Sequence, residues 1–321
     1  MPDQNLRIGW VGFHREGIQA LRSLLESGIR LEGVITLDNT ALAKRSAAAG
    51  YTSLLAPYDV PLHEVSSIND VSSVSLLRTM QLDLLFVIGW SQILSPEALS
   101  TARLGVIGAH ASLLPHHRGS APINWTLIRG EAIAGNTLIW LTEGVDEGGI
   151  VDQMAFPVTP YDTCESLYDK VAESNLTMIL RLLPRLFSGD KPGRPQLHTD
   201  EPVLPRRRPS DGLLDWSQSG KQVYDFVRAL TRPYPGAFSF LNKQRWIIQS
   251  CALLPEELVS DADPGMVLGS VFSPVAEACG LVVSCGSGSV VILELEQSDG
   301  QILKGAALSD LAWKGMVWTN D

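Results

Sequence analysis

The sequence predicts an α/β protein with a mostly parallel sheet covered by helices, followed by a small domain of short strands. Three observations lead to this prediction. Near-continuous apolar runs alternate with amphipathic stretches in the first half, a proline-rich segment interrupts them near residue 188, and closely spaced short apolar runs follow. Apolar strands that alternate with helices are typical of parallel sheets buried on both faces.

The opening of the chain predicts a βαβ unit. Residues 7–11 form a short apolar run, residues 16–27 place apolar side chains on one helical face, and residues 31–37 form a second strand. Later strands are expected at residues 82–88, 105–109, 136–141 and 150–156. Helices are expected at residues 95–102, 121–129 and 164–183. The last helix should end there because Pro184 follows.

The turn after the first strand does not match a dinucleotide-binding turn. Gly12 and Gly17 have no glycine between them, so the G-x-G-x-x-G spacing that lets a backbone approach a pyrophosphate is missing. The sequence also has no G-x-x-x-x-G-K-[ST] loop. We therefore expect no NAD site.

The second half of the chain has a different sequence pattern. Residues 188–210 contain five prolines and little periodicity, which is typical of a linker. One helix is expected at residues 221–230, and short strands are expected at residues 238–241, 246–251, 265–271, 281–284 and 290–295. The expected division is a first domain over residues 1–188, a linker over residues 189–210 and a β-barrel-like domain over residues 211–321.

Composition describes an ordinary globular protein with an acidic balance. Its 321 residues include 35 Asp+Glu and 25 Lys+Arg, for a formal net charge of −10. A chain of this length can fold without disulfides or metals. The four cysteines form no CxxC pair, so reduced thiols are expected. The N-terminus has no signal-like pattern and no apolar run reaches 18 residues, so we expect a cytoplasmic protein with no membrane partner.

The densest polar constellation lies between residues 105 and 150. His110 stands where an apolar strand ends, and Pro115 and Gly119 shape the following loop. Ligands bind at the carboxyl ends of strands in open α/β sheets, so this loop is the candidate site. The alternative is that His110 caps the strand and Arg118 is a solvated loop cation.

The adjacent histidines His116 and His117 raise the question of a metal site. Two adjacent side chains cannot both face one point on a regular element, and no further ligand follows at metal-site spacing. We expect a solvated loop pair and no metal.

Two blocks of the sequence closely resemble the formyltransferase family that uses N10-formyltetrahydrofolate. The first begins with HASLLP at residues 110–115, continues through Arg118 and Gly119, and ends with VDEGGI at residues 145–150. The second comprises DGLLDW at residues 211–216 and PYPGAFS at residues 233–239. The resemblance implies a Rossmann-like catalytic domain that binds the folate donor, followed by a C-terminal OB-like β-barrel.

The resemblance also implies two catalytic side chains. Formyl transfer to an amine passes through a tetrahedral intermediate, which requires a proton acceptor and a donor for the oxyanion. The family uses an Asn-x-His pair and a distant Asp, and His110 and Asp146 match the His and the Asp. Imidazole titrates near neutrality, and a neighbouring carboxylate favours its charged form. The alternative for Asp146 is a turn residue before two glycines.

The sequence departs from the family at Gly108, where the asparagine normally stands. An oxyanion-hole donor is typically worth about 2.7 to 4 kcal/mol. Either another donor replaces the family's asparagine, or the activity is lowered or lost. The replacements considered are Asn124, Asn136, a backbone N–H and protonated His110. Asn136 is the candidate expected to be catalytic, and a structural amide at the start of a strand is the alternative.

Further site residues follow from the resemblance. The family places the pterin near the end of strand 84–88 and the loop before Asp146. The donor is therefore expected to contact Gly89, Trp90, Ile93, Leu94 and Glu143. Trp90 either stacks on the donor or is a buried aromatic at the strand end. The acceptor is expected to contact Ser112, Arg118 and Asn124.

Three kinds of acceptor occur in this family: methionyl-tRNA, glycinamide ribonucleotide and nucleotide-linked amino sugars. The domain over residues 211–321 speaks against the glycinamide type. Residues 205–321 hold 10 Lys+Arg and 13 Asp+Glu, a net charge of −3, which leaves −7 for the first 204 residues. Because phosphate contacts supply most of the affinity for nucleic acids, this balance speaks against tRNA.

The expected acceptor is therefore a nucleotide-linked amino sugar, with no nucleic acid partner. The blocks HASLLPHHRGSAPINW and PYPGAFS look closest to the UDP-4-amino-4-deoxy-L-arabinose formyltransferases. The alternative is formyl transfer to methionyl-tRNA. A third hypothesis is a non-catalytic relative that binds folate or a nucleotide. An apolar face of the barrel offers a surface for a homodimer.

Overall fold

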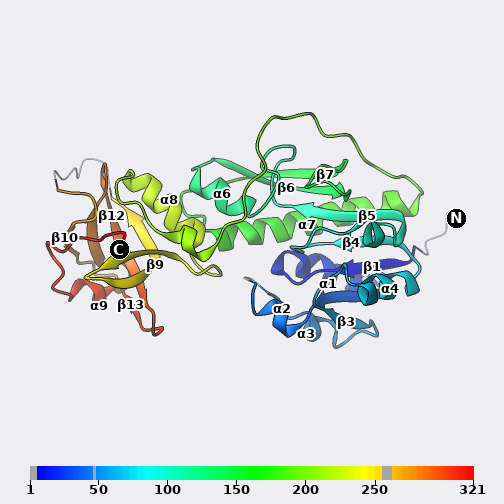
Figure 1. Ribbon diagram of the computed structural model, residues 1–321, viewed down its shortest axis with the longest axis horizontal. Helices are drawn as coiled ribbons and strands as arrows, with labels where there is room; N and C mark the ends of the chain where they lie inside the picture. Colours follow the sequence, from blue (N-terminus) through cyan, green and yellow to red (C-terminus); the bar gives the residue numbers. More distant parts are fainter. Residues whose placement is uncertain (1–5, 46–47, 255–261) are drawn as a thin grey trace. The chain divides into compact units, whose positions relative to one another are not determined.

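The computed structural model describes residues 6–45, 48–254 and 262–321 (Figure 1). The chain divides into two compact units, and each unit is made of three separate stretches of the sequence. Unit 1 comprises Met1–Pro122, Ile133–Pro157 and Leu167–Pro205. Unit 2 comprises Ile123–Ala132, Val158–Ser166 and Arg206–Asp321.

Unit 1 contains one seven-stranded sheet with the order β3-β2-β1-β4-β5-β6-β7. The first five strands in that order are parallel, while β6 and β7 are antiparallel to their neighbours. The strands are β1 (Ile8–Val11), β2 (Leu31–Leu37), β3 (Leu62–Val65), β4 (Leu82–Val87), β5 (Ala102–His110), β6 (Ile133–Trp140) and β7 (Ile150–Pro157). The prediction of a mostly parallel sheet is confirmed.

Two apolar clusters in unit 1 bury opposite sets of strand side chains. One joins the sheet to α1 and α7 through residues such as Leu21, Leu24 and Ile179. The other joins it to α4 and α5 through Val74, Leu77 and Ala98. The helical segments that lie wholly or mainly in unit 1 are η1 (Arg15–Gly17), α1 (Ile18–Glu26), α2 (Asn39–Leu42), α3 (Tyr51–Leu55), α4 (Val71–Thr79), α5 (Pro96–Leu99) and α7 (Cys164–Phe187). Helix α6 (Pro122–Ile128) belongs to unit 2 from Ile123 onwards.

Helix α7 corrects the expectation that the helix would stop at residue 183. It continues through Pro184 to Phe187, and Ser188 N–H donates to the Pro184 carbonyl at 3.1 Å. Leu186 is 3% exposed and belongs to the core. Burial of the last turn therefore offsets the hydrogen bond that proline cannot donate.

Unit 2 is built on an antiparallel sheet with the order β10-β11-β12-β9-β8, and β13 pairs with β12. The C-terminal segment bridges both edges, because Thr319 pairs with Phe240 of β8 and Val317 pairs with Met266, next to β10. This pairing closes the sheet in the manner of a barrel. Its elements are η2 (Pro209–Gly212), α8 (Gly220–Leu230), β8 (Ala237–Leu241), β9 (Gln244–Leu253), β10 (Val267–Val271), η3 (Ala276–Ala278), β11 (Gly280–Ser284), β12 (Ser289–Gln297), β13 (Ile302–Lys304) and α9 (Ala306–Ser309).

The segment expected to be a linker is divided between the units. Residues 189–205 belong to unit 1, and residues from Arg206 onwards belong to unit 2. Arg194 pairs with Ile150, and Leu204 pairs with Gly119, so the first part lies against unit 1 as an ordered strap. The prolines of this segment interrupt the periodicity by which a strand or helix is recognised in a sequence. They do not prevent its backbone from pairing with unit 1.

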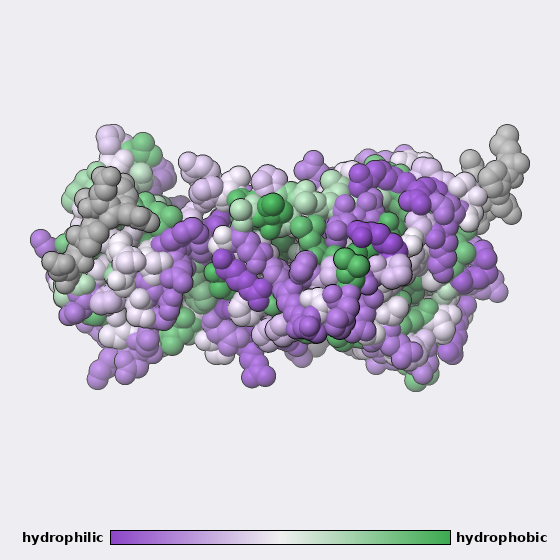
Figure 2. Space-filling model, turned by 90° about the horizontal axis from the view of Figure 1, so that it is seen from above, coloured by the Kyte–Doolittle hydropathy of each residue, from purple (hydrophilic) through white to green (hydrophobic). Residues whose placement is uncertain are grey.

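The visible surface in Figure 2 is mostly hydrophilic, with hydrophobic groups scattered among the purple side chains. Within the described ranges, no helix combines the length and apolar character needed to cross a bilayer.

Candidate active site

The carboxyl ends of three neighbouring strands lie in one row. Val11 of β1 pairs with Val87 of β4, which pairs with Gly108 of β5. The loops after these strands therefore leave the sheet at the same edge. Strand order reverses between β1 and β4, and in open α/β sheets ligands bind at such a switch point.

His110 and Asp146 come together at this edge. The His110 Nδ1 atom lies 3.4 Å from the Asp146 carboxylate, and the His110 Nε2 atom lies 2.8 Å from the His117 carbonyl oxygen. The Asp146 carboxylate accepts a hydrogen bond from the Gly119 N–H at 2.9 Å. His110 is 8% exposed, so its ring is held on several sides.

These contacts define what His110 can do. A carbonyl oxygen only accepts hydrogen bonds, so the His117 contact assigns the proton of neutral His110 to Nε2. Nδ1 is then the atom able to accept a proton. The imidazolium formed in this way would be stabilised by the Asp146 carboxylate beside it. Such an arrangement is chemically able to accept a proton at Nδ1 beside a carboxylate.

The loop between His110 and Gly119 is shaped by its own polar groups. Ser112 is 3% exposed and donates from Oγ to the His116 carbonyl at 2.8 Å. The Ser112 carbonyl accepts from Thr137 Oγ1 at 2.6 Å. Ser112 thus maintains the loop and has little surface for an acceptor. Arg118 forms an ion pair with Glu147 at 3.7 Å, on the outer side of the turn that carries Asp146.

Gly108 has no room for the family's asparagine. A Cβ atom added there would lie 2.6 Å from Leu141 Cδ2 and 2.9 Å from its Cγ. Leu141 therefore occupies the space into which a side chain at position 108 would project. The two residues form a matched small–large pair.

Asn136 and Asn124, both expected at the site, have buried side chains whose amides contact other parts of the protein. Asn136 is 0% exposed, and its Nδ2 atom donates to Ser174 Oγ at 2.9 Å and to Asn175 Oδ1 at 2.6 Å on α7. His110 pairs with Thr137, and neighbouring strand residues point to opposite faces, so Asn136 faces away from the loop that Thr137 contacts. These contacts favour the alternative, a structural amide.

Asn124 has a similarly closed environment within unit 2. It is 1% exposed, and its Nδ2 atom donates to the Ala229 carbonyl at 2.5 Å. The sequence could not distinguish this amide from an exposed one, because its partner lies 105 residues away. The Asn124 side chain is therefore buried, with its amide nitrogen bonded to the Ala229 carbonyl.

The residues expected to contact the donor occupy varied surroundings. Gly89 has φ +66°, and its carbonyl accepts from the N–H groups of Phe13 and His14 at 3.3 and 3.2 Å. Trp90 packs edge-on against Phe13 with 5.8 Å between centroids. Ile93 is 61% exposed, whereas Leu94 is a core residue at 5%. Glu143 is exposed. Trp90, Ile93 and Glu143 thus keep surface for a ligand, and Leu94 does not.

A second histidine–carboxylate pair, which sequence reasoning missed, lies after β1. His14 Nδ1 lies 3.6 Å from the Glu16 carboxylate and accepts the Glu16 backbone N–H at 3.4 Å. Burial, aided by the charge of Arg15, lowers the pKa of His14 to about 4. Burial raises the pKa of Glu16 to about 7. Desolvation thus favours the neutral form of both groups.

The strap supplies two more side chains that sequence reasoning missed. The Gln196 amide donates to the carbonyls of Asp146 and Gly148 at 2.6 and 2.8 Å. Glu201 lies 3.0 Å from His116 Nδ1 and 3.5 Å from His117 Nε2. Burial acts to raise the pKa of Glu201, but the hydrogen bond from His116 and the charge of His117 lower it overall.

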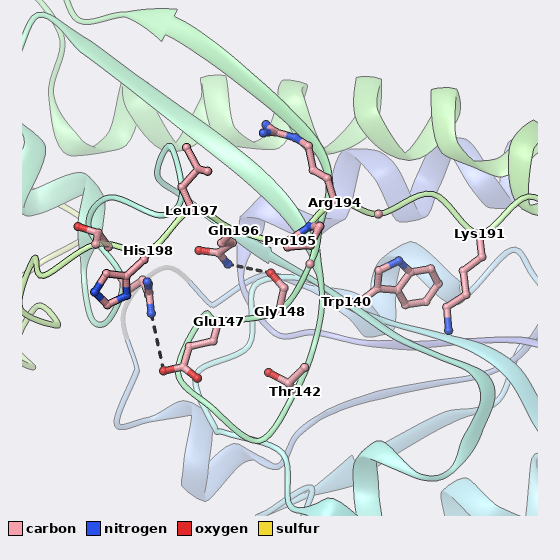
Figure 3. A pocket seen from close by; sticks show the side chains of 14 residues that line it. Trp140, Thr142, Glu147, Gly148, Lys191, Arg194, Pro195, Gln196, Leu197 and His198 are labelled. Carbon is pink, nitrogen blue, oxygen red and sulfur yellow. Dashed lines mark hydrogen bonds and ion pairs between the residues drawn. The ribbon is translucent and has the colours of Figure 1, made fainter.

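The strap and the Asp146 turn border a pocket of about 850 Å³ (Figure 3). Its lining includes Trp140, Gln196 and the cations Arg118, Lys191 and Arg194. Lys191 Nζ lies 4.6 Å from the centre of the Trp140 ring and donates to the Leu104 carbonyl. No cluster of three metal-ligating side chains occurs in residues 6–45, 48–254 and 262–321.

Fold and site together define a two-unit α/β protein with an acid–base pair at the carboxyl edge of its sheet. A family model described as formyl transferase matches residues 21–183. A second, described as the formyl transferase C-terminal domain, matches residues 207–310. The chain belongs to the formyl transferase family.

Solved structures share this fold. HypX from Aquifex aeolicus, in complex with tetrahydrofolic acid, is 18% identical with a TM-score of 0.63 over 94% of this chain. This chain spans 46% of the HypX chain, about half its length. An N-formyltransferase from Helicobacter canadensis, in complex with folinic acid and dTDP-3-aminofucose, is 15% identical with a TM-score of 0.63, covering 90% of this chain and 99% of that one.

A third structure matches a smaller part of the molecule. Glycinamide ribonucleotide transformylase 1 from Symbiobacterium toebii is 22% identical with a TM-score of 0.51. The match covers 61% of this chain and 96% of that one. At these identities each likeness is one of fold.

Proposed function

We propose that the protein transfers the formyl group of N10-formyltetrahydrofolate to the amine of a nucleotide-linked amino sugar. The observation that carries this proposal is the His110–Asp146 pair, with 3.4 Å between Nδ1 and the carboxylate. In a chain of the formyl transferase family, this pair lies at the sheet edge where ligands of open α/β folds bind.

The proposed reaction uses His110 twice. The acceptor nitrogen attacks the formyl carbon, a new C–N bond forms, and the amine proton moves to His110 Nδ1. The tetrahedral intermediate then collapses, the bond to folate N10 breaks, and His110 returns the proton to N10. Asp146 and the His117 carbonyl flank the imidazolium between these steps.

Gly108 makes the proposed enzyme a slow one. The donor amides of Asn124 and Asn136 are both engaged elsewhere, which leaves a backbone N–H or the charge of His110 to stabilise the oxyanion. Loss of one oxyanion-hole donor typically lowers kcat by about 10²- to 10³-fold. We expect a rate reduced on that scale relative to a site with the asparagine.

Charge and pocket size support a small anionic acceptor. The chain has a net charge of −10, yet Arg118, Lys191 and Arg194 line one pocket of about 850 Å³. Ligand pockets usually measure about 300 to 1,000 Å³, and one or two cations are sufficient for a diphosphate. The Helicobacter canadensis relative, whose structure contains dTDP-3-aminofucose, supports this class of acceptor by its shared fold.

A single-turnover assay tests the proposal. Formyl transfer from N10-formyltetrahydrofolate to dTDP- and UDP-linked amino sugars is expected with the native protein and not with His110→Ala. The alternative is formyl transfer to methionyl-tRNA. Tight, salt-dependent binding of initiator methionyl-tRNA at moderate ionic strength would favour it.

The pairing of Gly108 with Leu141 also favours a second candidate, a relative that binds its ligands without transferring the formyl group. Leu141 fills the position of the missing oxyanion donor with an apolar side chain. Calorimetric binding of folate and a nucleotide sugar, with no product after prolonged single-turnover incubation, would identify this case.

A further inference from the structure

The strap, residues 189–205, is anchored to unit 1 at Arg194 and at Leu204. At one end, Arg194 exchanges two backbone hydrogen bonds with Ile150 at 2.8 and 2.9 Å. At the other, the Leu204 N–H donates to the Arg118 carbonyl at 2.7 Å, and the Leu204 carbonyl accepts from Ser120 at 3.0 Å. The strap falls between the two family models, which match residues 21–183 and 207–310.

Between these anchors, Gln196 clamps the turn that carries Asp146. Its amide nitrogen reaches two carbonyl oxygens, those of Asp146 and Gly148 (Figure 3 shows the second contact). Asp146 has φ +52°, a left-handed conformation that Asp adopts more readily than most residues with a side chain. A Cβ atom at Gly148 would lie 1.6 Å from the Trp140 carbonyl oxygen. A turn with such restricted geometry needs external contacts to persist.

Glu201 holds the turn on the other side of His110. Its carboxylate contacts both His116 and His117, at 3.0 and 3.5 Å. His117 has φ +58°, and its carbonyl is the group 2.8 Å from His110 Nε2. The strap therefore contacts both turns that orient the catalytic pair.

We propose that the strap positions the catalytic pair: Gln196 holds the turn bearing Asp146, and Glu201 holds the turn whose carbonyl fixes the His110 ring. Gln196 and Glu201 are positioning residues, because they act through Asp146 and His117. The inference rests on the proposed function for its rate readout. A misplacement of about 1 Å at a catalytic group can cost on the order of 10²-fold in rate.

The test compares Gln196→Met and Glu201→Gln with the native protein. Gln196→Met keeps the side-chain length and removes both donors, and we expect a 10- to 100-fold lower single-turnover rate with KM for the folate donor changed less than about 3-fold. Glu201→Gln should lower the rate about 3- to 10-fold. Asp200→Asn is the matched control, because it makes the same charge change at the neighbouring, 99% exposed side chain, and it should leave the rate unchanged.

A second readout does not require turnover. The ring ¹⁵N shifts of His110 report which nitrogen carries the proton in the ligand-free protein. We expect Gln196→Met and Glu201→Gln to change these shifts and Asp200→Asn to leave them as in the native protein. If the native protein formylates no acceptor, the proposed function fails, and the shifts still decide the role of the strap.

Unchanged His110 shifts in both strap variants would overturn the inference, even if their thermal unfolding midpoints fall. Equal loss of rate in Asp200→Asn would also overturn it, because the effect would then not depend on the clamped turns. If Gln196→Met does not fold, Gln196→Asn is measured in the same two ways. It keeps the amide but is one methylene too short to reach both carbonyls, so the same shift change is expected.

Discussion

Two histidine–carboxylate pairs lie at the carboxyl edge of the same sheet, with almost equal separations. His110 and Asp146 are 3.4 Å apart after β5, and His14 and Glu16 are 3.6 Å apart after β1. Asp146 accepts a backbone N–H, whereas burial raises the pKa of Glu16 to about 7. The two pairs therefore differ in the surroundings of their carboxylates, although their separations are almost equal.

The surroundings of the second pair favour the neutral forms of both side chains. His14 Nδ1 accepts a backbone N–H, and its ring packs edge-on against Tyr168 with 4.8 Å between centroids. The Glu16 carbonyl accepts from Asn175 at 3.2 Å, and Asn175 accepts from Asn136. Asn136 thus belongs to the support of this pair. We interpret His14–Glu16 as structural and His110–Asp146 as chemical.

The largest expected effect is the loss of the chemical pair. His110→Ala removes the proton acceptor, so the single-turnover rate should fall about 10²- to 10⁴-fold. Asp146→Asn should also lower the rate, because the imidazolium loses its carboxylate partner. Asp200→Asn is the control, because it makes the same change as Asp146→Asn at a 99% exposed side chain, and it should change the rate less than about 3-fold. Equal rates in His110→Ala and the native protein would rule out the chemical role.

Restoring the family's asparagine is expected to have the next largest effect. Gly108→Asn alone should destabilise the fold by about 1 to 3 kcal/mol, because the new side chain meets Leu141. Gly108→Asn combined with Leu141→Ala provides the space, and we expect its single-turnover rate to exceed the native rate by about 10-fold or more. Leu141→Ala alone is the control. A double variant no faster than this control would show that the missing donor does not limit the reaction.

Glu16→Gln should change how stability depends on pH. A folded-state pKa of about 7, above the usual value of 4.5, means that Glu16 favours folding at low pH and that this contribution is lost between pH 4.5 and 7. Over that range the stability of Glu16→Gln relative to the native protein should rise by up to about 3 kcal/mol. Denaturant unfolding at several pH values measures this difference. A constant difference from pH 4.5 to 8 would contradict the assigned pKa.

His14 should act in the opposite direction. Its folded-state pKa of about 4 lies below the usual value of 6.5, so neutral His14 favours folding at neutral pH and this contribution is lost as the pH falls from 6.5 to 4. In Glu16→Gln the pH dependence of stability that comes from His14 is no longer offset by that of Glu16. The stability of that variant should therefore rise from pH 4 to 6.5 and then level off.

The smallest expected effect on rate comes from Asn136. Asn136→Ala removes buried hydrogen bonds to Ser174 and Asn175, so stability should fall by about 1 to 3 kcal/mol. The single-turnover rate should change less than about 3-fold, because the side chain faces α7. A rate loss of 10²-fold in a folded variant would return Asn136 to a catalytic role.

The sequence predicted the parallel sheet, the short-stranded second unit and His110 at a strand end, because local periodicity and loop motifs determine these features. It did not predict which face Asn136 occupies, since that depends on the pairing of His110 with Thr137. The continuation of α7 past Pro184 depends on burial of Leu186 in a core formed by distant segments. Gln196 contacts residues 48 and 50 positions away, a separation that no local pattern reveals.

The most direct test of the account is a competition for one limiting pool of N10-formyltetrahydrofolate. The native protein is given equal concentrations of a dTDP- or UDP-linked amino sugar and initiator methionyl-tRNA, and the fate of a labelled formyl group is followed in a single turnover. We expect label on the sugar amine with the native protein, and none on either acceptor with His110→Ala. Label on the tRNA, or equal transfer to the sugar by His110→Ala, would contradict it.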